Sequence, residues 1–193
     1  MKLLNVTKKV LGPLSYLMIK HEEKRWYDIY IPFFFSLCIS IIWWQHRFPL
    51  LGDIGLISKI NSLLQVLIGF YIASLAAVAT FGNPKIDKVM AGTPPKIFEK
   101  FNGVYTWVTL NRRQFLSRMF GYLSFVSLFL FVIGVFADLC LNGWAPDKYL
   151  KIIFLFCYSI VLFNLLTTTL LGLYYLAIRI HRHDGDSECI DDT

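Results

Sequence analysis

Charged residues are scarce in this chain. Only 17% of its 193 residues are Asp, Glu, Lys or Arg, whereas 56% are hydrophobic and 17% are aromatic. A soluble domain carries about a quarter charged residues, so too few are present here to cover a water-exposed surface. This composition, with a mean hydropathy of +0.55, is typical of a protein whose solvent is the lipid bilayer.

The chain also lacks the usual patterns of catalysis and metal binding. Its four cysteines form no C-x-x-C pair, so neither a disulfide framework nor a zinc site is expected. No G-x-S-x-G, H-E-x-x-H, P-loop or dinucleotide-binding fingerprint occurs. We therefore expect no catalytic residues, no metal and no cofactor, and we expect that the protein is not an enzyme.

Four apolar segments dominate what is present. A bilayer about 30 Å thick needs about 20 helical residues at a rise of 1.5 Å each. The predicted transmembrane helices are 29–44, 63–81, 119–141 and 152–178. The first is short, and Trp26 and Trp44 mark its two interfaces. The predicted fold class is all-α: one membrane domain, 1–193, with four transmembrane helices and further amphipathic helices at the interface or in the cytoplasm.

Residues 1–25 carry apolar side chains at three- and four-residue steps, with lysines beside them. This pattern predicts an interfacial amphipathic segment that bends near Gly12 and Pro13. Two explanations remain open: the segment rests on the inner leaflet, or it packs on a neighbouring subunit. At the other end, 179–193 is acidic and is expected to be disordered.

The orientation follows from the basic residues. Fifteen of the nineteen Lys and Arg residues lie in the N-terminal segment, the central loop 82–118 or the tail. Cytoplasmic loops collect Lys and Arg. Both termini and the basic loop are therefore expected in the cytoplasm, and the basic charge needs no direct contact with nucleic acid.

The central loop is too long for a simple connection, since helix connections in bundles usually take about two to eight residues. Thr93 followed by two prolines suits the start of a helix, and apolar residues then recur at helical spacing from Ile97 to Val108. We predict a helix over about 94–109 that lies at the membrane surface or docks a partner. The basic residues predicted to dock that partner are Lys85, Lys88, Lys96, Lys100, Arg112 and Arg113.

Small and polar residues inside the spans give the remaining candidates. Gly69, Ala73 and Ala77 fall four apart, which is the spacing that lets helices approach closely in lipid. The same face is a weaker candidate for a pore lining. Polar residues inside the spans are functional candidates because lipid does not solvate them. They are Gln65, Asp138 and Asn164.

The layout resembles the membrane subunits (KwaA) of the Kiwa anti-phage defence system. The resemblance lies in the size, the four spans, and a basic inner loop after the ASLAAVATF, GNP and MAGTPP stretches. It implies a homo-oligomer in the bacterial inner membrane that senses infection and works with a cytosolic DNA-binding effector of the KwaB type. It implies no particular functional residue.

Two hypotheses of function follow. The leading one is a non-enzymatic membrane sensor or scaffold that recruits and controls a cytosolic effector. The alternative is a small oligomeric channel or a transport-accessory subunit. The identity of the neighbouring gene separates them: a cytosolic DNA-binding protein favours the first, and a transporter ATPase favours the second.

Overall fold

The computed structural model describes residues 12–19, 25–80, 95–101, 104–141 and 147–176. Its elements in chain order are η1 (Gly12–Met18), η2 (Trp26–Tyr30), α2 (Ile31–His46), α3 (Leu56–Thr80), β1 (Lys96–Phe101), β2 (Val104–Thr109), α4 (Arg112–Leu141) and α5 (Lys148–Tyr174). Among these residues, four helices are long and apolar enough to cross a membrane. The prediction of an all-α, multi-pass membrane protein is confirmed.

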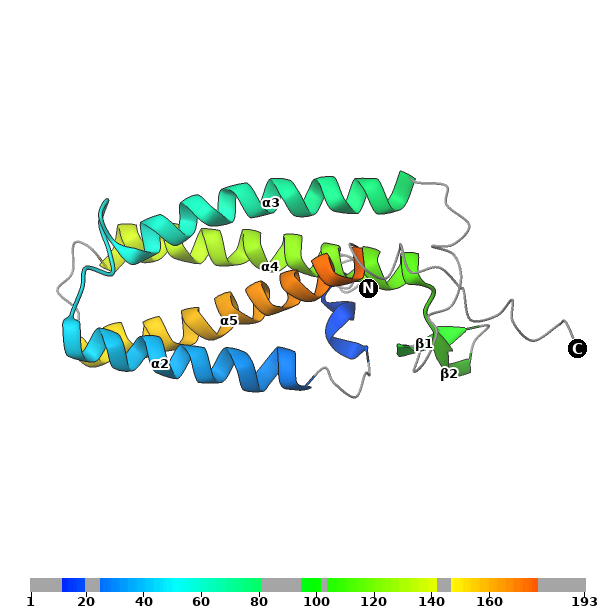
Figure 1. Cartoon of the computed structure of the whole chain (residues 1–193), viewed down its shortest axis with the longest axis horizontal. Coiled ribbons are helices and arrows are strands. Elements are labelled where there is room, and N and C mark those ends of the chain that lie inside the picture. Colours follow the sequence, from blue (N-terminus) through cyan, green and yellow to red (C-terminus); the bar gives the residue numbers. More distant parts are fainter. Residues whose placement is uncertain (1–11, 20–24, 81–94, 102–103, 142–146, 177–193) are drawn as a thin grey trace, which may run out of the picture.

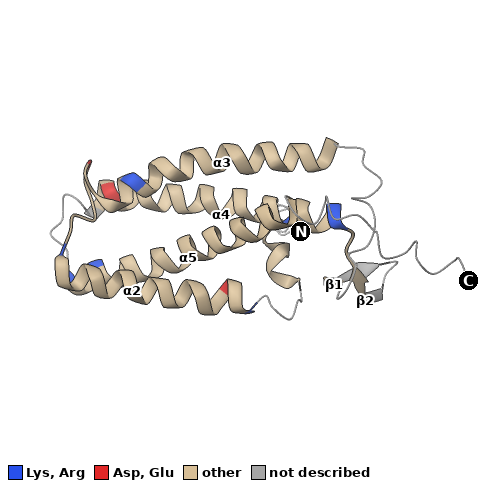
Figure 2. Cartoon of the chain, viewed as in Figure 1, with Lys and Arg blue, Asp and Glu red and all other residues tan. Residues whose placement is uncertain are grey.

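The four long helices form two closely packed pairs. α3 packs most extensively on α4, and α2 packs most extensively on α5. Across Figure 1 the helices follow the order α3, α4, α5, α2. Charged residues lie towards the two ends of the bundle, and the middle of each helix is uncharged (Figure 2). Lipid can therefore surround the middle of the bundle without solvating a charge.

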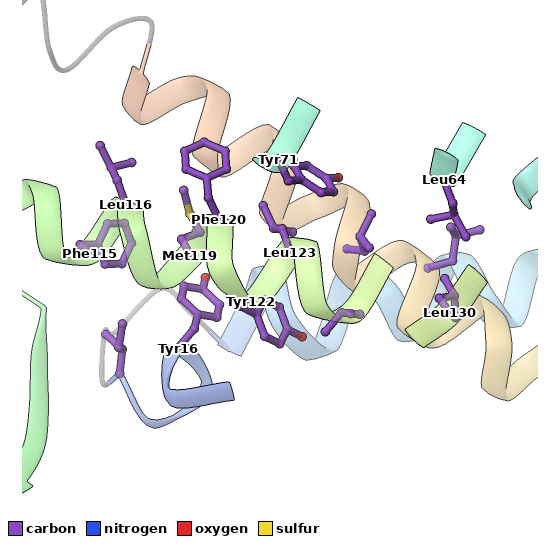
Figure 3. Packing of buried hydrophobic residues seen from close by; sticks show 14 of the residues in the cluster. Tyr16, Leu64, Tyr71, Phe115, Leu116, Met119, Phe120, Tyr122, Leu123 and Leu130 are labelled. Atoms are coloured by element: carbon purple, nitrogen blue, oxygen red, sulfur yellow. The ribbon is translucent and has the colours of Figure 1, made fainter. Parts of the chain in front are cut away.

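The core lies between α3, α4 and α5. Leu64 and Tyr71 of α3 are fully buried, and Figure 3 shows Leu64 beside Leu130 and Tyr71 beside Leu123 of α4. Because lipid tails are as apolar as these side chains, helix association depends on close packing and on hydrogen bonds between helices.

Tyrosine hydroxyls supply hydrogen bonds between helices that are distant in the sequence. They join Tyr71 to Thr169 (2.6 Å), Tyr122 to Asn164 (2.7 Å) and Tyr158 to Asn61 (3.5 Å). Two of these bonds connect α3 with α5, whose backbones approach each other less closely than those of α3 and α4. A tyrosine side chain is long enough to cross that wider spacing, so these bonds tie the two helix pairs together.

The predicted helix over 94–109 is wrong. The segment forms an antiparallel hairpin in which Lys96 pairs with Thr109 and Phe101 pairs with Val104. β-Branched and aromatic residues dominate β2, and such residues favour strands. The two residues between the strands are Asn102 and Gly103, the pair most typical of a two-residue hairpin connection.

The bounds of the spans also differ from the expected ones. α3 begins at Leu56 rather than at residue 63, and α4 begins at Arg112 rather than at residue 119. The first turns contain polar residues such as Lys59 and Arg118 and were therefore left out of the predicted spans. A hydropathy pattern indicates where lipid begins and not where a helix begins. Of the N-terminal segment, residues 12–19 and 25 are described, and the stretch up to residue 11 lies outside the described residues.

Close approach between α3 and α4 depends on Gly134, because a methyl group there would overlap the side-chain amide of Asn61. Gly134→Ala should lower the thermal stability in detergent, by about 1–3 kcal/mol for an overpacked contact. Gly121→Ala is the matched control, since nothing lies within 4 Å of its added methyl. It should be neutral or slightly stabilising, because Ala is the better helix former. Equal behaviour of the two variants would contradict this packing.

Candidate functional site

The β-hairpin has one buried side and one exposed side. Successive residues of a strand point to opposite faces. Ile97 is buried, with 1% of its surface exposed, whereas Phe98 and its partner Trp107 are 48% and 49% exposed. The Phe98 and Trp107 rings lie against each other with centroids 5.1 Å apart. Lys96, two residues before Phe98, is also exposed. We refer to Lys96, Phe98 and Trp107 as the hairpin face.

The hairpin is anchored firmly at its base. Ile97 and Leu110 belong to the same buried cluster as the helix core. The Leu110 N–H donates to the Pro95 carbonyl oxygen at 3.0 Å, which closes the open end of the hairpin. The Gln114 side chain then accepts the Asn111 N–H at 3.2 Å, one half of the reciprocal cap that starts many helices. The hairpin face is therefore held at a fixed place beside the first turn of α4.

The residues predicted to dock a partner have different positions. Lys96 is exposed on β1, and Arg112 and Arg113 are half-buried at the start of α4. The Arg113 guanidinium reaches the carbonyl oxygens of Val78 and Ala79 at 3.4 Å. Carbonyls at a helix C-terminus lack partners within the helix and carry partial negative charge. Arg113 thus ties α4 to the end of α3. Lys100 lies on β1 opposite Tyr105, and Lys85 and Lys88 lie outside the described residues.

Tyr16 fixes η1 against the same end of the bundle. Its ring stacks on Tyr122, with centroids 5.0 Å apart, and lies 6.3 Å from Phe115 (Figure 3). Burial, followed by the nearby Asp28 carboxylate, raises the pKa of the Tyr16 hydroxyl well above its usual value. Tyr16 therefore stays neutral at physiological pH and acts as a packing residue. Leu17 and Met18 beside it are exposed.

The three intramembrane polar candidates fall into separate places. Asp138 accepts the Gly52 N–H at 2.6 Å and holds the loop between α2 and α3. Asn164 accepts the Tyr122 hydroxyl and donates to the backbone oxygen of Asp28 at 3.1 Å. Gln65 is exposed on α3. These residues do not come together in one site.

Two of the three small residues predicted to pack on another helix are exposed in the single chain. Gly69 and Ala73 are exposed and Ala77 is half-buried. A side chain added at Gly69 would meet nothing within 4 Å. Within one copy of the chain, the close helix contacts use Gly134 against Asn61 and Gly172 against Met119 instead.

The aromatic pair of the hairpin face was missed by reasoning from the sequence alone. The signals were Asn102 and Gly103 in the middle of the segment and the β-branched and aromatic residues of 104–109. Within the described ranges, no group of three or more His, Cys, Asp or Glu side chains lies close enough to hold a metal. Comparisons with family models, curated proteins and solved structures find no match to this chain.

The Asp138 contact has a direct test at the loop that it holds. Asp138→Ala leaves the half-buried Gly52 N–H without its acceptor and should lower stability in detergent by about 1–3 kcal/mol. Asp138→Asn keeps an oxygen acceptor but loses the charge, so it should lower stability by less. Limited proteolysis of the 47–55 loop should rank the variants in the same order. Equal losses in both variants would mean that the charge, and not the hydrogen bond, matters.

Proposed function

We propose that this protein is a non-enzymatic membrane scaffold that recruits a soluble protein through its hairpin face. The observation that carries the proposal is the exposed Phe98–Trp107 pair, with Lys96 beside it, on a hairpin anchored to the membrane bundle. Half-exposed aromatic residues on a rigid support are typical of protein interfaces, where tryptophan is enriched among the residues that dominate binding.

The position of the hairpin in the chain favours a soluble partner. The hairpin directly precedes Arg112, the first residue of α4, and α4 is long and apolar enough to cross the membrane from that residue on. The exposed Lys96 on β1 is costly to leave in lipid. These observations support a position of the hairpin face in the aqueous phase.

The charge distribution supports a cytoplasmic position for this end of the bundle, by the positive-inside rule. Together with the resemblance to Kiwa membrane subunits, it supports a more specific form of the proposal. The protein resides in the bacterial inner membrane, senses phage infection there, and recruits and controls a cytosolic DNA-binding effector of the KwaB type.

The alternative function, a small channel or transport-accessory subunit, has less support. The buried polar side chains Asn61 and Asn164 bond to tyrosine hydroxyls of neighbouring helices. Such mutual pairing is what helix packing in lipid requires, and it leaves fewer groups to line a path for ions or solutes.

Docking on the hairpin face is tested with the soluble product of a neighbouring gene. Trp107→Ala should weaken its binding by about thirtyfold or more, as for a central interface aromatic. Lys96→Glu should weaken it more at low salt than at high salt. Lys59→Glu, an exposed lysine in the first turn of α3 at the opposite end of the bundle, is the control. Unchanged binding by both hairpin variants would place the docking surface elsewhere.

We also propose that the exposed small residues of α3 face a second copy of the chain in a homo-oligomer. Ala73→Phe should then reduce the oligomer mass in detergent, because small residues are what permit close approach. Since Ala73 is exposed in the single copy, the thermal stability of dissociated monomers should not change. An unchanged oligomer would exclude this face as the contact.

A further inference from the structure

The hairpin face has a candidate ligand within the same chain. We propose that the acidic stretch 184–192 binds the hairpin face and covers it until a partner displaces the stretch. The regulatory part of this inference rests on the proposed docking function, whereas the intramolecular contact does not. Three features of the chain support it: where the tail leaves the bundle, its length, and its charge.

α5, the helix that precedes the tail, ends beside the base of the hairpin. Tyr175, at the end of α5, lies against Phe115 of α4 with ring centroids 5.3 Å apart. Phe115 is one helical turn after the start of α4, and β2 ends at Thr109. The end of α5 and the hairpin occupy the same end of the molecule in Figure 1.

The tail is also long enough to reach the hairpin face. Seven residues, 177–183, separate Leu176, the last described residue, from Asp184. An extended chain spans about 3.3 Å per residue, so the eight steps from Leu176 to Asp184 reach about 26 Å. A strand of six residues is about 20 Å long, so the whole hairpin lies within that reach from the base of α4.

Charge and chemistry match between the two segments. The stretch 184–192 contains five carboxylates and no basic residue, with Ile190 among them. The hairpin face offers the Lys96 ammonium, which suits the carboxylates, and exposed aromatic rings, which suit Ile190. Arg112, at the base of the hairpin, has a buried Nε with no hydrogen-bond partner among the described residues, and a carboxylate would supply one.

A weak contact is sufficient for this role, because the tail is tethered. A short flexible tether gives an effective concentration in the millimolar range. If the tail covers the face nine-tenths of the time, the apparent affinity for a partner falls about tenfold. Removal of the tail should therefore strengthen partner binding by about that factor.

The contact is tested by zero-length carbodiimide coupling of carboxylates to lysines in the purified full chain. Peptide mapping should find 184–192 joined to Lys96 and not to Lys59 or Lys148, which are exposed at the opposite end. The coupling should disappear in about 0.5 M salt, where charges are screened, and when the five carboxylates are changed to Asn and Gln. The proposal is overturned if the tail does not couple to Lys96, or if it couples to Lys59 in equal yield.

Two further arms separate the possible outcomes. Mixing equal amounts of isotope-labelled and unlabelled chains shows whether tail and hairpin belong to one copy. A share of mixed products near the statistical value of about half would contradict an intrachain contact. Partner binding to a chain that ends at His183 is then compared with Trp107→Ala. Coupling to Lys96 with partner binding insensitive to Trp107→Ala leaves the tail contact standing and rejects the docking function. If coupling is absent but partner binding depends on Trp107, the tail contact is rejected and the docking function stands.

Discussion

Hydrogen bonds from tyrosine hydroxyls across the bundle are the interaction on which the rest of this structure depends. Inside lipid, apolar contact alone favours a helix neighbour little more than a lipid tail, so polar pairing and close fit decide how helices associate. Tyr71 and Tyr158 link α3 with α5, and Tyr122 links α4 with α5. These bonds add specific polar links to the apolar packing of α4 on α5, so they join the α3–α4 pair to the α2–α5 pair.

The two ends of the bundle are built differently around this centre. At one end, Trp43 bonds the Phe48 carbonyl, and Asp138 bonds Gly52, so a short loop closes down on the helices. At the other end, the first turns of α4 extend from Tyr122 back to Arg112, and the anchored hairpin with its exposed aromatic rings precedes them. The two ends of the bundle therefore present different surfaces. In the proposed function, the hairpin is the surface that meets a soluble partner.

The sequence predicts the parts of this fold that lipid dictates and misses the parts that tertiary contacts dictate. Apolar length identified four spans, because burial of the backbone in lipid leaves a helix as the solution for each. The hairpin was missed because Ile97, Phe101, Val104 and Val108 satisfy a helical spacing as well as two alternating strands. Neither the Gly52 contact of Asp138 nor the exposure of Gly69 and Ala73 could be predicted. Both depend on which helix lies beside which, and periodicity in one helix does not record that.

The central claim is that the hairpin face is cytoplasmic and that the Gly52 loop lies on the other side of the membrane. Single cysteines replace the exposed residues Thr106 and Ile54 in a chain whose native cysteines are changed to serine or alanine. Each single-cysteine variant is treated with a membrane-impermeant maleimide, first in intact spheroplasts and then after permeabilisation. Ile54→Cys should react in intact spheroplasts, and Thr106→Cys only after the membrane is opened. Labelling of Thr106→Cys from outside would contradict the account.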